Sequence, residues 1–378
     1  MNKTRSLLFV LVAGGLTIPP SAAWPQAATR NVVVIVPDGL RWQEVFAGAE
    51  TGLMDRERGG VPDSERLRRD FSRPTPVEAR RALLPFLWDV AVCRGQLFGN
   101  QQQGSVARVL NGLNFSYPGY NEMLTGRPDP RVNSNGIGPN PNATVFEFLN
   151  RQPELRGRVA AFGTWGVFAD IFNQARSGLP VFAGWNPPSF ARAVPRLAIL
   201  SEVQRNMTRL WEDNLHDAFL QAWLKEYVRE HRPRLLFVGY GETDEWAHMG
   251  RYDLTLRAAH QFDRFVAELW EILQDMPEYR DRTTFILAAD HGRGDGPGNW
   301  QRHGRDVPGS EAVWIGVFGP DTEPLGERRN VPPVTLGQVA ATVAALLGYD
   351  WQREAPEAAA PLADVLPRRS QVTQPVRP

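Results

Sequence analysis

The sequence of 378 residues contains a single cysteine, Cys93, so it cannot form an internal disulfide. It also lacks net formal charge, because 42 Lys and Arg residues balance 42 Asp and Glu residues. A neutral chain gives no electrostatic basis for binding nucleic acid or an anionic membrane surface. The length suits one large α/β domain or two smaller ones, with a core that needs no disulfides to be stable.

Long apolar runs are missing too, except near the start of the chain. Lys3 and Arg5 precede the apolar residues 7–16, and small residues follow at 21–23. This order is typical of a secretory signal peptide, which we assign to residues 1–23. The run is short for a membrane span, and no cysteine lies near the cleavage site, which disfavours a lipoprotein. We therefore predict an exported protein, periplasmic or secreted, with no membrane span in the mature chain.

Three short β-branched apolar runs each lead into a loop that carries an aspartate. Residues 32–36 precede Asp38, residues 235–238 precede Asp244, and residues 284–289 precede Asp290. Such runs without polar alternation indicate strands buried on both faces, hence a parallel sheet. Because ligands bind beyond the carboxyl ends of such strands, we expect the three aspartates to gather there.

Helical patterns separate these strands, at residues 214–228, 256–273 and 334–347. The predicted fold is α/β, with a mostly parallel central sheet and helices on both faces. We expect one domain over residues 30–352 and a poorly ordered, Pro- and Ala-rich tail over residues 353–378. Residues 171–207, rich in Pro and aromatic residues, are a candidate cap insertion that forms one wall of a cleft.

Three histidines extend the set of aspartates. His248 follows Asp244 by four residues, so both side chains share one face if a helix begins there. His291 is adjacent to Asp290, and His303 lies in a Gly-containing loop 12 residues further on. Three Asp and three His residues are enough for two divalent ions, and a set without Cys suits zinc, with manganese or iron as alternatives.

A nucleophile is available in the loop-dominated region 99–142. Ser116 lies in the segment from Asn114 to Gly126, and a serine bound to a divalent cation can lose its proton near neutral pH. A serine that only shapes the turn before Tyr117-Pro118 is the alternative interpretation.

These stretches resemble the alkaline phosphatase superfamily, in particular its branch of type I phosphodiesterases and nucleotide pyrophosphatases. The resemblance extends from the first strand to the last helix. Its motifs are Asp38-Gly39-Leu40-Arg41-Trp42, the loop from Ser116 to Gly126, Thr243 to His248, Ala289-Asp290-His291-Gly292, and His303-Gly304 with Phe318-Gly319-Pro320.

The resemblance implies a role for each matching residue. One ion would be held by Asp38, Ser116, Asp290 and His291, and the other by Asp244, His248 and His303. Ser116 would attack phosphorus and form a phosphoseryl intermediate. Asn140 matches the family's phosphate-binding asparagine after a short insertion. The implied function is hydrolysis of phosphate mono- or diesters of small molecules.

Other functions remain open at this stage. The branch usually has Thr where this chain has Ser116. A formylglycine sulfatase requires Arg four residues after the nucleophile, where this chain has Tyr120. A sulfate or phosphonate ester hydrolase of the same superfamily and a non-catalytic exported metal-binding protein are the alternatives. The pattern identifies neither the leaving group nor the oligomeric state.

Overall fold

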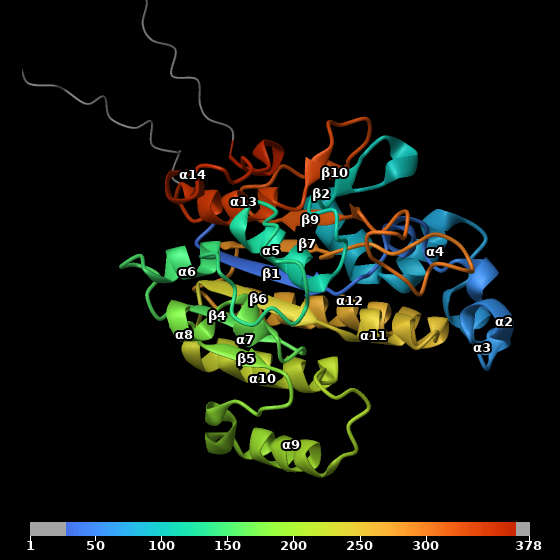
Figure 1. The fold of residues 1–378 in the computed structure, drawn as a ribbon, viewed down its shortest axis with the longest axis horizontal. Coiled ribbons are helices and arrows are strands. Elements are labelled where there is room, and N and C mark those ends of the chain that lie inside the picture. The colour runs from blue at the N-terminus through green and yellow to red at the C-terminus, as the bar shows by residue number, and fades with distance from the viewer. Residues whose placement is uncertain (1–27, 368–378) are drawn as a thin grey trace, which may run out of the picture.

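The computed structural model describes residues 28–367, so the predicted signal peptide lies outside the described residues. An eight-stranded sheet forms the centre of the molecule, in the order β10-β2-β9-β7-β1-β6-β4-β5 (Figure 1). Its strands are β1 (Asn31–Pro37), β2 (Gly95–Phe98), β4 (Val159–Gly163), β5 (Val181–Ala183), β6 (Leu235–Tyr240), β7 (Thr283–Ala288), β9 (Ile315–Phe318) and β10 (Gly326–Glu327). A small second sheet has the order β11-β3-β8, from Val334–Thr335, Ala107–Arg108 and Ala312–Val313.

The central sheet is mostly parallel, as the sequence predicts. β1 pairs in parallel with both β6 and β7, and β4 pairs in parallel with β6 and β5. β9 runs antiparallel to both of its neighbours, β7 and β2. The three strands predicted from apolar runs are therefore adjacent in the middle of the sheet, and every residue of β1, β6 and β7 is buried.

Helices cover both faces of the sheet, and the side chains of β6 show how. Phe237 packs against Tyr120 of α5 (Ser116–Thr125) and Phe146 of α6 (Val145–Asn150). Tyr240 packs against Phe262 of α12 (Tyr252–Asp275). Because positions three apart on a strand face opposite sides, α5 and α6 lie on one face and α12 on the other.

The remaining helices complete these layers. α13 (Gln338–Leu346) contacts α5 and α6, while α10 (Asp217–His231) contacts α12 and β4. α11 (Glu242–His248) connects β6 to α12. Shorter helices precede β2 and follow β4 and α13: α1 (Trp42–Ala47), α2 (Arg56–Gly59), α3 (Ser64–Phe71), α4 (Pro76–Leu83), α7 (Phe168–Ile171), α8 (Gln174–Ser177) and α14 (Trp351–Glu354). Among the described residues, no helix is both long and apolar enough to cross a membrane.

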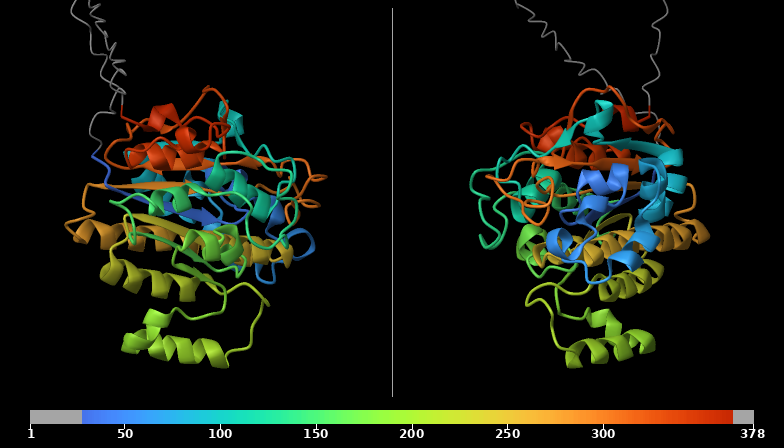
Figure 2. Two further views of the ribbon diagram at one scale, coloured as in Figure 1. Left: turned by 60° about the vertical axis from the view of Figure 1, so that its left-hand side comes forward. Right: turned by 90° about the vertical axis from the view of Figure 1, so that its right-hand side faces the viewer.

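The predicted insertion is only partly separate from the rest of the fold. β5, within residues 171–207, is the edge strand of the central sheet, so the first half of this segment belongs to the main domain. α9 (Pro195–Asn206) lies outside the layers, beyond α10 (Figure 2). Phe190, just before α9, packs on Tyr227 and His231 of α10.

Two further segments differ from the sequence pattern. Of the predicted tail 353–378, residues 353–367 pack against the domain, because Leu362, Val365 and Leu366 are buried and Gln96 donates a hydrogen bond to the Asp364 carbonyl. The high Pro and Ala content of this segment is typical of disorder, so the sequence pattern did not indicate that these few apolar residues are buried. Residues 368–378 lie outside the described residues. Ser116 also lies on no loop: it is the first residue of α5, a helix whose ten residues are all buried.

Candidate two-metal active site

The three strand-end aspartates meet at one edge of the sheet. Asp38 directly follows β1, Asp290 lies two residues after β7, and Asp244 lies on α11 after β6. Since β7, β1 and β6 are neighbours and parallel, their carboxyl ends bring the three carboxylates together. Asp290 is completely buried and Asp38 nearly so.

Asp38, Asp244 and His291 form one group of potential metal ligands, with donor atoms within 4.8 Å of one another. His291 Nε2 lies 3.3 Å from Asp38 Oδ1 and 3.6 Å from Asp290 Oδ2. His291 Nδ1 lies 2.9 Å from the Gly292 carbonyl, which can only accept a hydrogen bond. In the neutral ring this leaves Nε2 unprotonated and directed at the carboxylates.

Asp244, His248 and His303 form a second such group. The predicted helix does begin before Asp244, and His248 Nε2 lies 3.1 Å from Asp244 Oδ2 one turn away. The Nε2 atoms of His248 and His303 are 3.0 Å apart, and His303 Nδ1 lies 3.2 Å from the Asn114 carbonyl. Asp244 belongs to both groups, so its carboxylate lies between them.

Two glycines allow this close packing. Gly39 has φ +58°, and a Cβ there would lie 2.6 Å from Asp244 Oδ1. Its amide donates to Asp290 Oδ1 at 3.0 Å. A Cβ at Gly119, on α5, would lie 2.2 Å from the Asp290 carbonyl oxygen. Any side chain at either position would therefore push the aspartates apart.

Ser116 lies beside the first group of ligands. Its Oγ is 3.3 Å from His291 Nε2 and 3.5 Å from Asp38 Oδ1. As the first residue of α5, it is next to backbone amides at the helix N-terminus, where anions are stabilised. The amide of Tyr117 donates to Asn135 Oδ1 at 3.0 Å.

Burial and mutual repulsion shift the pKa values of the carboxyl groups. Burial, and then Asp244, raise the pKa of Asp38 to about 7. The same causes, burial and the charge of Asp38, raise the pKa of Asp290 well above its usual range. Burial would also raise the pKa of Asp244, but Arg293 and His248 outweigh it and hold that pKa well below its ordinary value. The site thus concentrates negative charge that needs cations nearby.

The histidines are shifted in the direction that suits metal binding. Burial lowers the pKa of His291 to about 4 and that of His303 to about 3. Both rings are therefore neutral at physiological pH, which is the form that binds a metal ion.

The donor set fits two divalent cations. It offers nitrogen and oxygen atoms in two clusters, as borderline ions prefer. Asp290 Oδ2 is buried without any hydrogen-bond partner, which is costly for a carboxylate unless a cation satisfies it. The residues present therefore suit the predicted pair of ions.

Three residues at this site were missed by the sequence reasoning. Tyr120 OH donates to Asp38 Oδ2 at 2.9 Å, and Thr243 Oγ1 donates to the Asp38 carbonyl at 2.6 Å. Arg293, 2% exposed, forms an ion pair with Asp244. Two signals were available: Tyr120 lies one helical turn after Ser116, and Arg293 follows directly after Asp290-His291-Gly292.

Asn140, the predicted phosphate-binding residue, uses its side chain for hydrogen bonds within the protein. The residue is completely buried, and its Nδ2 donates to Asn121 Oδ1 and to the Ile171 carbonyl. Its Oδ1 accepts from the amide of Asn142. Asn140 therefore links its own loop to α5 and α7, and the side chain that accepts from the first turn of α5 is that of Asn135.

Sequence comparison identifies one family. Residues 143–312 match the family of type I phosphodiesterases and nucleotide pyrophosphatases. The matched range includes Asp244, His248, Asp290, His291 and His303, while Asp38 and Ser116 precede it. No curated protein matches the sequence.

Solved structures show the same fold at low sequence identity. A mutant of the alkaline phosphatase PafA aligns with a TM-score of 0.54 and 11% identity, covering 91% of this chain and 100% of that one. The protein Ps i-CgsB aligns with a TM-score of 0.53 and 18% identity over 88% of this chain and 75% of that one. The lipoteichoic acid synthase LtaP from Listeria monocytogenes gives 0.50 and 11%, over 88% and 75%.

Proposed function

We propose that this chain, a member of the alkaline phosphatase superfamily, hydrolyses phosphate mono- or diesters with Ser116 as the nucleophile. The observation that carries the proposal is the position of Ser116 Oγ, at the N-terminus of α5 and within 3.5 Å of both His291 Nε2 and Asp38 Oδ1. A serine whose only role was to shape a turn would not need this surrounding.

The predicted ligand sets are retained in the proposal. Asp38, Ser116, Asp290 and His291 would hold one ion, and Asp244, His248 and His303 the other. When bound, the ions would favour the deprotonated form of Ser116 and offset negative charge on the phosphoryl group and the leaving oxygen. Zinc suits this set of N and O donors, with manganese and iron as alternatives.

The chain's own residues supply the steps. Ser116 Oγ forms a bond to phosphorus while the bond from phosphorus to the leaving oxygen breaks, which gives a phosphoseryl intermediate. Water then attacks phosphorus, the bond to Ser116 Oγ breaks, and phosphate or a phosphomonoester is released. The positive end of the α5 dipole at Ser116 favours the negative charge of the phosphoryl oxygens. Tyr120 holds Asp38 in place through its 2.9 Å hydrogen bond.

Replacing the nucleophile tests the proposal. Ser116→Ala should lower kcat on p-nitrophenyl phosphate and bis-p-nitrophenyl phosphate by at least about 10³-fold, because it removes the attacking atom. Metal content, measured by elemental analysis, should stay within one ion of the wild type. Ser201→Ala is a matched control, since Ser201 is also buried but lies on α9 with its hydroxyl donated to Leu197. Full activity in Ser116→Ala would contradict the mechanism.

Comparing the turnover of different esters that share one leaving group, p-nitrophenol, separates the alternative activities. The p-nitrophenyl sulfate and phenylphosphonate esters would be turned over faster than both phosphates by a sulfate or phosphonate ester hydrolase. Stoichiometric metal without turnover of any ester would favour a metal-binding protein without catalysis. Position 120, Tyr in this chain, disfavours a formylglycine sulfatase.

A further inference from the structure

An open cavity of about 610 Å³ lies at the carboxyl ends of β4 and β5. It is formed by the loop after β4, by β5 and the loop that follows it, and by residues 209–213 before α10. Gly163 and Ala183, at the carboxyl ends of β4 and β5, mark the edge of the sheet at which the candidate ligands also gather. The volume is in the range of cavities that bind small molecules.

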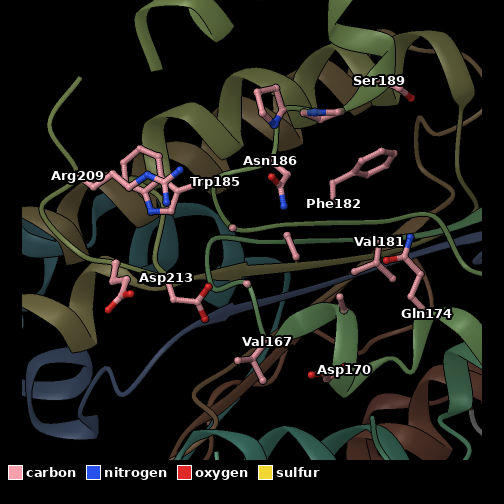
Figure 3. Close-up of a pocket in the computed structure, with 17 residues that line it drawn as sticks. Val167, Asp170, Gln174, Val181, Phe182, Trp185, Asn186, Ser189, Arg209 and Asp213 are labelled. Atoms are coloured by element: carbon pink, nitrogen blue, oxygen red, sulfur yellow. The ribbon is translucent and has the colours of Figure 1, made fainter. Parts of the chain in front are cut away.

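Aromatic and polar side chains line this cavity together. Trp185, Arg209 and Asp213 lie together at one end, and Gln174 and Val181 lie at the other (Figure 3). The Arg209 guanidinium lies 5.1 Å from the centre of the Trp185 ring. Phe182 and Asn186 lie between the two ends (Figure 3). The cavity therefore offers ring faces together with groups that form directed hydrogen bonds.

The charged groups of the cavity are mostly carboxylates. Asp170, Glu212 and Asp213 line the cavity, against the single guanidinium of Arg209. Ionised carboxylates only accept hydrogen bonds, so the matching ligand must be rich in donors. An anionic group in the cavity would be repelled by the surplus of carboxylates.

Two kinds of ligand are rich in donors: cationic amines and polyhydroxylated molecules. The surplus of carboxylates would attract an amine, but Arg209 already occupies the ring face of Trp185 to which an ammonium group would bind. A neutral polyol has a donor on every hydroxyl and does not need that ring face to be free of a cation. Its C–H faces can pack on Phe182 and on the edge of the Trp185 ring. Asn186 and Gln174 can bind hydroxyl groups as both donors and acceptors.

Contacts connect this cavity to the residues that carry the candidate chemistry. Asn214, next to Asp213, donates to Glu245 Oε1 at 2.8 Å, and Glu245 is adjacent to Asp244. Trp211 packs against Trp246 of α11 with ring centres 4.8 Å apart. In the sheet, β4 and β5 are two and three strands from β1. Strand spacing therefore puts the cavity about 10–15 Å from Asp38, a span that one ester leaving group can cover.

We propose that the cavity between Phe182, Trp185 and Asp213 binds a neutral polyhydroxylated ring, a sugar or a cyclitol, that forms the alcohol part of the phosphate ester attacked by Ser116. The inference rests on the proposed function, because it names the substrate class of the same site. The binding step itself requires no catalysis and can be measured separately.

Binding is measured by calorimetry on full-length Ser116→Ala protein loaded with zinc. The probes are methyl glucoside, lactose, myo-inositol and choline. At least one neutral polyol should bind with a Kd below about 10 mM, and choline should bind more weakly. Sugars and myo-inositol as separate arms distinguish the two sources of a polyhydroxylated ring. Binding of choline alone, or of none of the probes, would overturn the proposal.

Substitutions in the cavity locate the binding. Trp185→Ala and Asp213→Asn should each weaken polyol binding by at least about tenfold, since they remove a packing face and an acceptor. Ser189→Trp fills the cavity from an exposed position, so it also tests the site if Trp185→Ala does not fold. Trp270→Ala is the matched control, because it removes another Trp that pairs with an arginine, Arg94, away from this cavity. Binding that survives all three cavity substitutions would refute the assignment.

Kinetic measurements on proteins that keep Ser116 then connect the cavity to the reaction. For the bound polyol, the ratio of kcat/KM on its p-nitrophenyl phosphodiester to kcat/KM on bis-p-nitrophenyl phosphate should fall at least about tenfold in Ser189→Trp. An unchanged ratio would show that the cavity does not bind the alcohol part. Undiminished aryl ester hydrolysis by Ser116→Ala would instead refute the proposed function and leave the binding result intact.

Discussion

Asp38 shows how much the candidate site depends on residues that are not ligands themselves. Its carboxylate accepts from Tyr120, its carbonyl accepts from Thr243, and the next residue, Gly39, donates to Asp290. A carboxylate in this position is expensive to bury, so each partner limits the orientations it can adopt. The geometry of the ligands is therefore fixed by neighbours from α5, α11 and the loop after β1.

Tyr120→Phe tests the contribution of one such neighbour. The substitution keeps the ring and removes the hydrogen bond to Asp38, so metal affinity should fall about 10–100-fold, as for other partners of metal ligands. A competition titration with a chromogenic chelator measures this change. The fold should be retained, because the buried ring still packs on Phe168 and Phe237.

Tyr117→Phe is the matched control for that measurement. Tyr117 is on the same helix and equally buried, but its hydroxyl donates to the Gly138 carbonyl at 2.8 Å. Its removal should cost stability without a change in metal affinity. Equal loss of affinity in both variants would indicate a general loosening of α5 and not a role for Tyr120 at Asp38.

At the scale of elements, α5 connects the nucleophile to its surroundings. Its first residue is Ser116, and Glu122, almost two turns later, accepts from the amides of Leu110 and Asn111. This ties the loop before Ser116 to the helix that carries it. Burial raises the pKa of Glu122 to about 7, despite those hydrogen bonds.

The raised pKa of Glu122 makes stability depend on pH. Between the unfolded pKa near 4.5 and the folded value near 7, the folded protein binds more protons than the unfolded chain. This group therefore stabilises the fold least above pH 7, and stability falls as pH rises through this window. The stability of Glu122→Gln relative to wild type should improve by about 1–3 kcal/mol from pH 5 to pH 8.

Urea unfolding of both proteins at several pH values measures that difference. Glu122→Gln removes one hydrogen-bond acceptor, which should lower the stability of the variant by the same amount at every pH. At pH 5 this constant loss should make the variant less stable than the wild type. Parallel pH profiles of the two proteins would show that Glu122 does not titrate in this range.

Sequence patterns predicted the elements that bury an apolar run or repeat it at a helical period. β1, β6, β7, α10 and α12 are all found close to their expected ranges. The sequence patterns did not predict α5, because the residues Ser116, Tyr117, Pro118 and Gly119 are typical of a turn. Pro118 and Gly119 are tolerated there: proline suits the first turn of a helix, and Gly119 is required by the contact with Asp290.

For the molecule as a whole, metal binding should be coupled to stability. Three carboxylates from separate strands lie within one cluster, so removal of the ions leaves repulsion among them. Zinc at 100 times its Kd should stabilise the fold by about 2.7 kcal/mol per site. A chelator should therefore lower Tm, and zinc, manganese and iron added back in turn identify the ion that restores it.

Asp244→Asn provides the control for the chelator experiment. Asp244 belongs to both ligand groups, so this variant should bind both ions more weakly and its Tm should respond less to the chelator. A wild-type Tm that does not change with the chelator would contradict the assigned ligands.

The segment after α14 should contribute to global stability. Truncation before residue 353 removes Leu362, Val365 and Leu366 from the core, at about 1.5–3 kcal/mol for each buried side chain. Truncation after residue 367 keeps Leu362, Val365 and Leu366 in place and is the matched control. Thermal unfolding should show a larger loss of stability in the first variant than in the second. Equal Tm values would contradict the packing role of this segment.

The sequence by itself determined the parallel sheet and the residues whose chemistry suits metal ions, because buried strands and Asp or His motifs leave local patterns. Only the tertiary structure decided that Asp244 lies between the two ligand groups, that Tyr120 and Arg293 contact the aspartates, and that Asn140 donates to Asn121 of α5. These facts depend on contacts between distant segments, such as Arg293 with Asp244, 49 residues apart, and Tyr120 with Asp38, 82 residues apart, or on loop paths. No local period encodes such contacts, because packing across the sheet and between loops determines them.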